Sequence, residues 1–173
     1  KGCKLISQHA DSMGAPTACE SAGVPNVSYN GSTLDACPNT FIVSSRINWV
    51  PYMKYMIECV RDNKAIDTDW CKGINEGAVE LTPINEKVAA PGTAEAIKAA
   101  EEQFKAGTLH VFDTSTFTVD GKTLTSYMAD VDTDEKFTPD TEVISNGYFH
   151  ESEKRSAPYF DINIDGITLL NEG

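Results

Sequence analysis

The first thirty residues alternate a short apolar run, a helical stretch and a second apolar run. The first run, at residues 5–7, ends in the polar stretch Gln8-His9-Ala10-Asp11-Ser12. The helical stretch ends at Gly23, a residue type that is common just after helices, and residues 24–29 form the second run. This order predicts a strand–helix–strand unit with a right-handed crossover. It constrains the fold to the α/β class, because such a unit requires parallel strands.

The next segment predicts a third strand followed by an amphipathic helix. Residues 41–45 are apolar and β-prone, and residues 50–61 have helical spacing with Pro51 in the first turn, where proline is tolerated. Apolar residues recur in this helix at positions i, i+3, i+4 and i+7, and we expect this stripe to pack in the core: Tyr52, Tyr55, Met56 and Cys59.

The remaining chain changes character after one more helix. Residues 93–105 have helical periodicity and stop before Gly107, and residues 109–112 predict a fourth strand. We expect a hairpin about Asp120-Gly121, an acidic loop over residues 129–139 and a further hairpin in the tail that ends near residues 160–167.

These patterns predict two regions of different architecture. We expect residues 1–112 to form an α/β ligand-binding lobe, with a parallel sheet flanked by helices. Residues 113–173 are expected to form a hairpin-rich C-terminal extension.

Composition excludes several classes of function. The formal net charge of -12 and the lack of a Lys/Arg cluster argue against a nucleic-acid partner, and no run of about 18 apolar residues predicts a membrane span. The five cysteines cannot all pair within the chain, and their spacings match no zinc site. Buried free thiols are therefore expected, and one disulfide between Cys19 and Cys37 remains an alternative.

Polar and aromatic residues follow three of the predicted strands. Ligands of open parallel sheets bind beyond the carboxyl ends of the strands, so these residues predict a site for a planar, hydroxylated solute. Structural roles are the alternative for each: Asp11 as a helix cap, Asn30 in a turn, Trp49 in the core and Arg46 in a surface ion pair. The candidates are His9, Asp11, Tyr29, Asn30, Asn48, Trp49 and Trp70.

No catalytic, cofactor or metal motif is present in the sequence. Asp132, Asp134 and Glu135 lack the rest of a calcium loop and predict a solvated acidic loop. We therefore expect neither a metal nor a cofactor and no catalytic residue. The enzyme alternative is a small α/β hydrolase or transferase that uses His9 and Asp11.

Six motifs occur in the order found in the BMP family of substrate-binding lipoproteins (basic membrane protein, PnrA-like). The resemblance covers about residues 1–125, and the tail around residues 156–161 resembles the ending of Gram-positive members. The motifs are those at residues 3–12, 18–23, 29–30, 48–52, 70–81 and 107–112, including Gln8-His9-Ala10-Asp11-Ser12, Tyr29-Asn30, Asn48-Trp49-Val50-Pro51-Tyr52 and Trp70-Cys71-Lys72-Gly73. The sequence departs from the family at Cys3, Lys4 and Val50, and none of these changes removes an expected ligand contact.

The resemblance implies a type I periplasmic-binding-protein (Rossmann-like) lobe of a two-lobe receptor whose N-terminal lobe is absent from this sequence. It implies an extracytoplasmic protein, lipid-anchored when whole, that delivers purine nucleosides or nucleobases to the permease of an ABC transporter. Asp11, Asn30, Asn48 and Trp49 are the positions carried over first, followed by His9, Tyr29 and Trp70. Another small solute such as a flavin or sugar, a sensory regulator and a purely structural surface protein remain alternatives.

Overall fold

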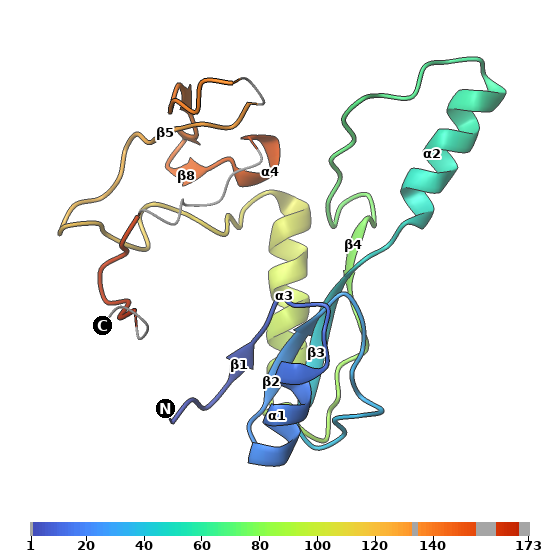
Figure 1. Cartoon of the computed structure of the whole chain (residues 1–173), viewed down its shortest axis with the longest axis vertical. Helices are drawn as coiled ribbons and strands as arrows, with labels where there is room; N and C mark the ends of the chain where they lie inside the picture. The colour runs from blue at the N-terminus through green and yellow to red at the C-terminus, as the bar shows by residue number, and fades with distance from the viewer. Residues whose placement is uncertain (1, 133–134, 155–161, 170–173) are drawn as a thin grey trace. The chain divides into compact units, whose positions relative to one another are not determined.

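The computed structural model of the chain describes residues 2–132, 135–154 and 162–169 (Figure 1). It divides into two compact units, Lys1–Ala106 and Gly107–Gly173. The predicted boundary, after residue 112, lies slightly further along the chain than this division. Each unit has its own elements and packing.

The first unit is an α/β layer around one four-stranded sheet. The strands lie in the order β1-β2-β3-β4; β1 pairs with β2 and β2 with β3 in parallel, and β4 is antiparallel to β3. The predicted α/β class with a parallel sheet and flanking helices is confirmed. Its elements are β1 (Ile6–Ser7), α1 (Gly14–Ala22), β2 (Asn26–Tyr29), β3 (Phe41–Ile47), α2 (Val50–Arg61), β4 (Val79–Leu81) and α3 (Thr93–Ala106).

The β1-α1-β2 crossover forms where the sequence predicts it. Gly23 ends α1 in a left-handed conformation (φ 66°), which glycine adopts without steric cost. The amide of Val24 then donates to the carbonyl of Cys19, 3.0 Å away. This bond caps the helix and turns the chain directly into β2, and α1 packs against that strand.

The connection from β2 to β3 contains no helix among its residues 30–40. A chain of hydrogen bonds between side chains holds it instead. The Asn26 amide donates to Thr40 Oγ1 (3.0 Å), and the Thr40 hydroxyl donates to Glu20 Oε2 on α1 (2.8 Å). Asn26 and Thr40 are almost fully buried, so these bonds satisfy polar groups that would otherwise be costly to bury.

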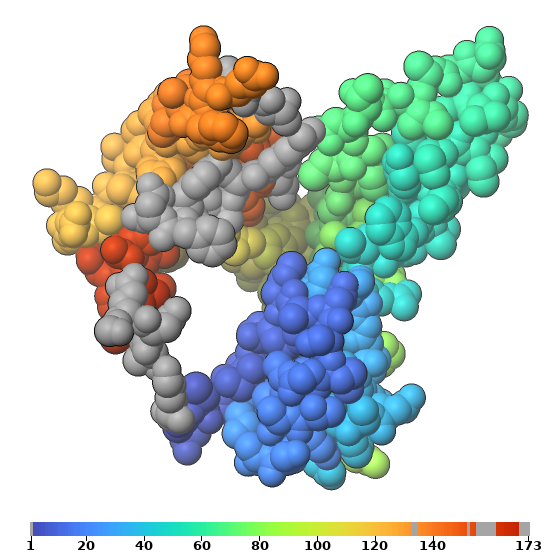
Figure 2. All heavy atoms as spheres, in the orientation of Figure 1, coloured from blue at the N-terminus to red at the C-terminus, as the bar shows by residue number. Residues whose placement is uncertain are grey.

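α2 spans the predicted residues, but its predicted packing is wrong. Of the expected stripe only Cys59 is buried, and Tyr52, Tyr55 and Met56 remain partly exposed. Figure 2 shows the side chains of α2 at the surface along the helix. A second apolar row is 48 to 71% exposed: Val50, Met53, Ile57 and Val60.

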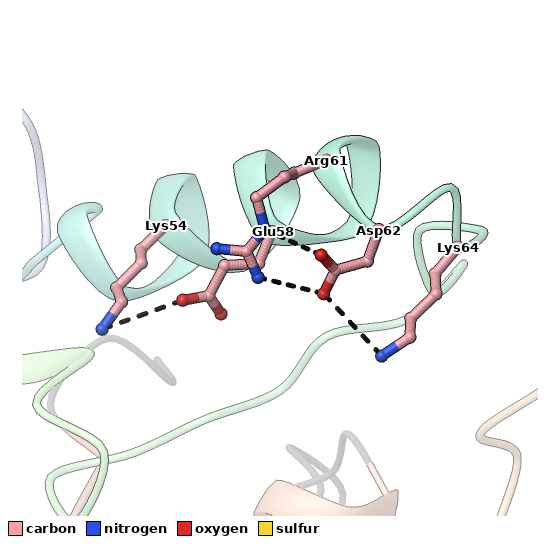
Figure 3. A network of polar contacts seen from close by, with 5 residues as sticks. All are labelled: Lys54, Glu58, Arg61, Asp62 and Lys64. Carbon is pink, nitrogen blue, oxygen red and sulfur yellow. Dashed lines mark hydrogen bonds and ion pairs between the residues drawn. The ribbon is translucent and has the colours of Figure 1, made fainter.

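Charged side chains line the polar side and the end of α2 (Figure 3). Lys54 lies 3.9 Å from Glu58, one turn along the helix, and Arg61 donates to both oxygens of Asp62 at 2.7 and 3.0 Å. The bond from Arg61 lowers the pKa of the Asp62 carboxyl. These pairs are exposed and contribute little to stability.

The second unit contains short strands around a small apolar core. The core consists of Ala129, Val143, Ile144 and Phe149. The hairpin of β7 and β8 is consistent with the predicted C-terminal hairpin extension, although it lies at other residues than the two hairpins expected from the sequence. The elements are β5 (Met128–Ala129), β6 (Thr141–Glu142), β7 (Ile144–Ser145), β8 (Tyr148–Phe149) and α4 (Glu151–Lys154).

The predicted strand over residues 109–112 is wrong. Residues 111–112 form a turn, and Phe112 packs edge-on against Phe149 at a centroid distance of 6.4 Å. The backbone of this segment pairs with Phe149, whose amide donates to the carbonyl of Phe112. Its apolar residues therefore belong to the second unit and not to the sheet of the first.

The predicted hairpin at Asp120-Gly121 is reduced to one bridge between Val119 and Lys122. Asp120 and Gly121 have φ values of 50° and 73°, as a primed hairpin turn requires. The predicted tail hairpin falls partly on residues 155–161, which lie outside the described residues.

No disulfide joins any of the five cysteines, including Cys19 and Cys37. Cys19, Cys37 and Cys59 are buried thiols as expected, whereas Cys3 and Cys71 are exposed, contrary to the expectation. Burial and the nearby Glu20 carboxylate raise the pKa of the Cys37 thiol. Within the described ranges, no helix is both long enough and apolar enough to cross a membrane.

Candidate functional site

An open pocket of about 250 Å³ lies at the carboxyl ends of β1 and β2. Parallel strands place their ends at one edge of the sheet, which is where α/β folds bind ligands. The pocket lies at the strand ends from which the sequence predicts ligand contacts, and ligand binding there stays a prediction. Its lining mixes polar and apolar groups and consists of Gln8, Ala10, Asp11, Ser12, Met13, Tyr29, Asn30, Gly31, Ser32 and Thr33.

Asp11 and Asn30 meet in this pocket although nineteen positions separate them in the sequence. The Asn30 side-chain amide donates to Asp11 Oδ1 at 3.3 Å and approaches Oδ2 at 3.5 Å. Both residues are exposed. Contacts of this length are weak hydrogen bonds, so a ligand that offers a donor to Asp11 or an acceptor to Asn30 can replace them.

The sheet positions these two side chains through the backbone. The amide of Gln8 donates to the carbonyl of Val27 (3.1 Å), which continues the β1–β2 ladder beyond β1. The amide of Asn30 donates to the carbonyl of Ser45 (2.6 Å) at the end of β2. Asn30 has a φ of 65°, a left-handed conformation that asparagine tolerates better than most residues.

Next to the pocket residues, the rings of His9 and Tyr29 stack with a centroid distance of 4.1 Å and an interplanar angle of 21°. His9 follows β1 and Tyr29 is the last residue of β2, so the stack brings the ends of these two strands into contact. No hydrogen bond joins His9 to Asp11 among the described residues, so the acid–base pair of the enzyme alternative is not formed there.

The other three predicted ligand residues lie around α2. They do not appear in the lining of the strand-end pocket, as far as the described residues show. Asn48 Oδ1 accepts a hydrogen bond from the amide of Val50 (3.1 Å), the first residue of α2, and Trp49 is the N-cap residue of this helix. Trp49 is 58% exposed.

Trp49 and Trp70 belong to one aromatic cluster with two tyrosines of α2. Trp70 lies 5.1 Å from Tyr52 and 6.3 Å from Tyr55 between ring centroids, and Trp49 packs edge-on against Tyr52 at 6.5 Å. A hydrogen bond with the Asp67 side chain raises the pKa of Tyr55 to about 12, so its phenol stays neutral at physiological pH. The cluster presents flat, partly exposed rings.

Arg46 has the structural role that the sequence left open. It lies opposite Glu80 in the β3–β4 ladder, and its Nε donates to Glu80 Oε1 at 2.5 Å. Met13, Ser32 and Thr33 were not singled out from the sequence, because the loops that bring them to the pocket have no periodic pattern. No group of three potential metal ligands occurs among the described residues.

Of the comparisons with known proteins, the search of solved structures gives a similarity. No family model matches the chain, and the search of curated proteins found no match. Among solved structures, the chain is similar to an ABC transporter system solute-binding protein from Conexibacter woesei DSM 14684, with 19% sequence identity and a TM-score of 0.47. The match covers 64% of this chain and 37% of that chain, so this chain spans well under half the length of the solved structure.

Proposed function

We propose that the chain is the ligand-binding part of an extracytoplasmic solute receptor that serves an ABC importer. The observation that carries this proposal is the meeting of Asp11 and Asn30 in an open pocket at the ends of two parallel strands. A carboxylate and an amide side by side offer hydrogen-bond acceptors and donors, and these groups can bind the polar edge of a small solute.

The finer proposal is that the solute is a purine nucleoside or nucleobase. Asp11 and Asn30 would bind its hydroxyls or ring nitrogens, and an aromatic face would stack on the base. The His9–Tyr29 stack and the exposed rings of Trp49 and Trp70 are the candidate faces. The family resemblance supports this ligand class, and it supports a permease partner and a lipid anchor on the whole protein.

The proposal also includes a second lobe that closes over the pocket. The pocket is open, and Asp11 and Asn30 in it are exposed, whereas ligand sites bury most of the ligand surface. Closure of two lobes about a hinge would supply the missing wall and would communicate binding to the transporter.

The test is calorimetric titration of the two-lobe protein and of the 173-residue chain with guanosine, adenosine, inosine and their bases. We expect saturable binding to the two-lobe protein and weaker binding to the chain alone. Asp11→Ala should weaken binding by about tenfold or more, because it removes a charged hydrogen-bond acceptor. The matched control is Glu102→Gln, which removes an exposed carboxylate of α3 and should leave binding unchanged.

Three results would contradict this proposal. Absence of binding by the two-lobe protein would exclude purines as its solute. Wild-type affinity in Asp11→Ala would place the ligand away from the strand-end pocket. Conversion of a nucleoside into a new product would favour the enzyme alternative, since a receptor returns its ligand unchanged.

A further inference from the structure

A serine, a histidine and a glutamate form a linear chain of contacts in the second unit, outside the strand-end pocket. Ser145 Oγ lies 2.6 Å from His150 Nε2, and His150 Nδ1 lies 3.0 Å from Glu153 Oε1. When the Nδ1 proton is donated to Glu153, Nε2 is left as an acceptor for the Ser145 hydroxyl. Hydroxyl, imidazole and carboxylate in this order are the arrangement by which proteins activate a serine nucleophile.

The hairpin places Ser145 where a reagent can reach it. Ser145 is the last residue of β7, faces Tyr148 of β8 in the ladder, and is exposed. Asn146 and Gly147 form the two-residue turn between them, with φ values of 53° and 83°. Such a primed turn holds the hairpin ends in a defined register.

His150 is held by a backbone hydrogen bond and by one stacked ring. Its backbone amide donates to the carbonyl of Val143, a core residue, at 2.9 Å. Its ring stacks on Tyr148 at a centroid distance of 4.3 Å, and Tyr148 in turn stacks on His110 at 3.5 Å. The His150 side chain is 12% exposed, so its ring has little freedom to leave Ser145.

Glu153 reaches His150 because α4 begins directly after the histidine. The two residues are one helical turn apart, and the amide of Lys154 donates to the carbonyl of His150 at 2.9 Å. His150 Nε2 also lies 3.3 Å from the carbonyl oxygen of Ser145. In the tautomer that bonds Glu153 this nitrogen carries no proton, so its partner is the hydroxyl and not the carbonyl.

We propose that Ser145 is an activated nucleophile that accepts acyl groups from small activated carboxylic esters. Ser145 Oγ attacks the ester carbonyl carbon while its proton passes to His150 Nε2. The bond from the carbonyl carbon to the leaving oxygen breaks, and that oxygen takes the proton from His150 Nε2. Water then attacks the acyl-serine by the same route, which releases the carboxylic acid and restores the serine hydroxyl. Glu153 acts as the positioning residue for the imidazole.

The experiment is incubation of the full chain with p-nitrophenyl acetate, with mass spectrometry of its peptides and measurement of p-nitrophenolate release. We expect one acetyl group on Ser145 and a release rate on the order of 10²-fold above that of Ser145→Ala, the gain that a positioned general base provides. Glu153→Gln keeps the size of the side chain and should lower the rate, and equal melting temperatures of the variants would exclude unfolding as the cause.

Ser115→Ala is the matched control. Ser115 is also exposed and contacts a carboxylate, Asp113, but no imidazole, so this variant should react like the wild type. Equal acetylation of Ser115 and Ser145, or equal rates for the wild type and Ser145→Ala, would overturn the proposal. The three contacts would then serve only to fasten α4 to the hairpin. Neither result depends on solute binding by the first unit.

Discussion

β3 and α2 follow one another in the chain and both carry many apolar residues, yet they are buried very differently. β3 begins with the apolar run of residues 41–43, and α2 repeats apolar residues at helical spacing. Phe41 in β3 is fully buried, and Val43 is 6% exposed. In α2 only Cys59 is buried, and Ile57 is 68% exposed. Periodicity therefore indicates which side chains share a face. Whether that face is covered depends on what the rest of the fold brings to it.

The contrast between strand and helix also divides the predicted ligand residues into two groups. Asp11, Tyr29 and Asn30 line one pocket because the backbone ladder aligns the ends of β1 and β2. Asn48 and Trp49 instead lie just before α2, where Asn48 Oδ1 accepts a hydrogen bond from the Val50 amide. Strand-end residues are brought together by the sheet itself, whereas helix residues depend on contacts that no local pattern specifies.

Shortening a buried side chain of β3 should have the largest effect on stability. Phe41→Ala leaves a cavity in the core of the first unit and should lower the free energy of unfolding by about 3–5 kcal/mol. Ile57→Ala on the exposed row of α2 should change it by less than about 0.5 kcal/mol. Denaturant unfolding of the two variants measures both. Equal destabilisation would mean that the exposed row of α2 is covered in solution.

The polar link between α1 and the β2–β3 connection should make stability depend on pH. Burial opposes ionisation of Glu20, but hydrogen bonds from Thr40 and Asn39 outweigh it and lower the pKa of this carboxyl below its ordinary value of 4.5. Because the folded pKa is below the unfolded pKa, the added stability is present above about pH 4.5 and is lost as the pH falls through the folded pKa.

Glu20→Gln removes this titration. The difference in unfolding free energy between the wild type and Glu20→Gln should therefore shrink as the pH is lowered below 4.5. Chemical denaturation at a series of pH values measures it, with Glu102→Gln as the control for loss of an exposed carboxylate. A difference that does not change with pH would mean that the Glu20 hydrogen bonds do not require its charge.

The smallest effect is expected at the start of α2. Asn48→Ala removes the side-chain acceptor for the Val50 amide and should cost about 1 kcal/mol of unfolding free energy, the net contribution of a typical hydrogen bond. Asn48→Asp keeps an acceptor and should cost much less. If both variants bind solute with wild-type affinity, Asn48 is a structural residue only. If Asn48→Asp is stable but loses binding, Asn48 also contacts the ligand.

The sequence predictions are accurate where the deciding interactions join residues near in sequence, and they fail where these interactions join distant residues. The bounds of α2 were predicted fully, and α1 ends at Gly23 as expected, because helix period and capping are local. The strand predicted over residues 109–112 is absent, since its aromatic residue packs on Phe149, far away in the sequence. The chain from Asn26 through Thr40 to Glu20 was not foreseen, because polar residues carry no periodic sign of burial.

The sequence by itself determined the α/β class of the first unit, its crossover and the polar ends of its strands, because these follow from local propensity and the alternation of apolar runs. Only the tertiary structure decided that Asp11 meets Asn30, that α2 leaves an apolar row exposed, and that Ser145, His150 and Glu153 align. Such outcomes depend on distances between side chains. Those distances are set by strand register and by the packing of whole elements, which no single stretch of residues encodes.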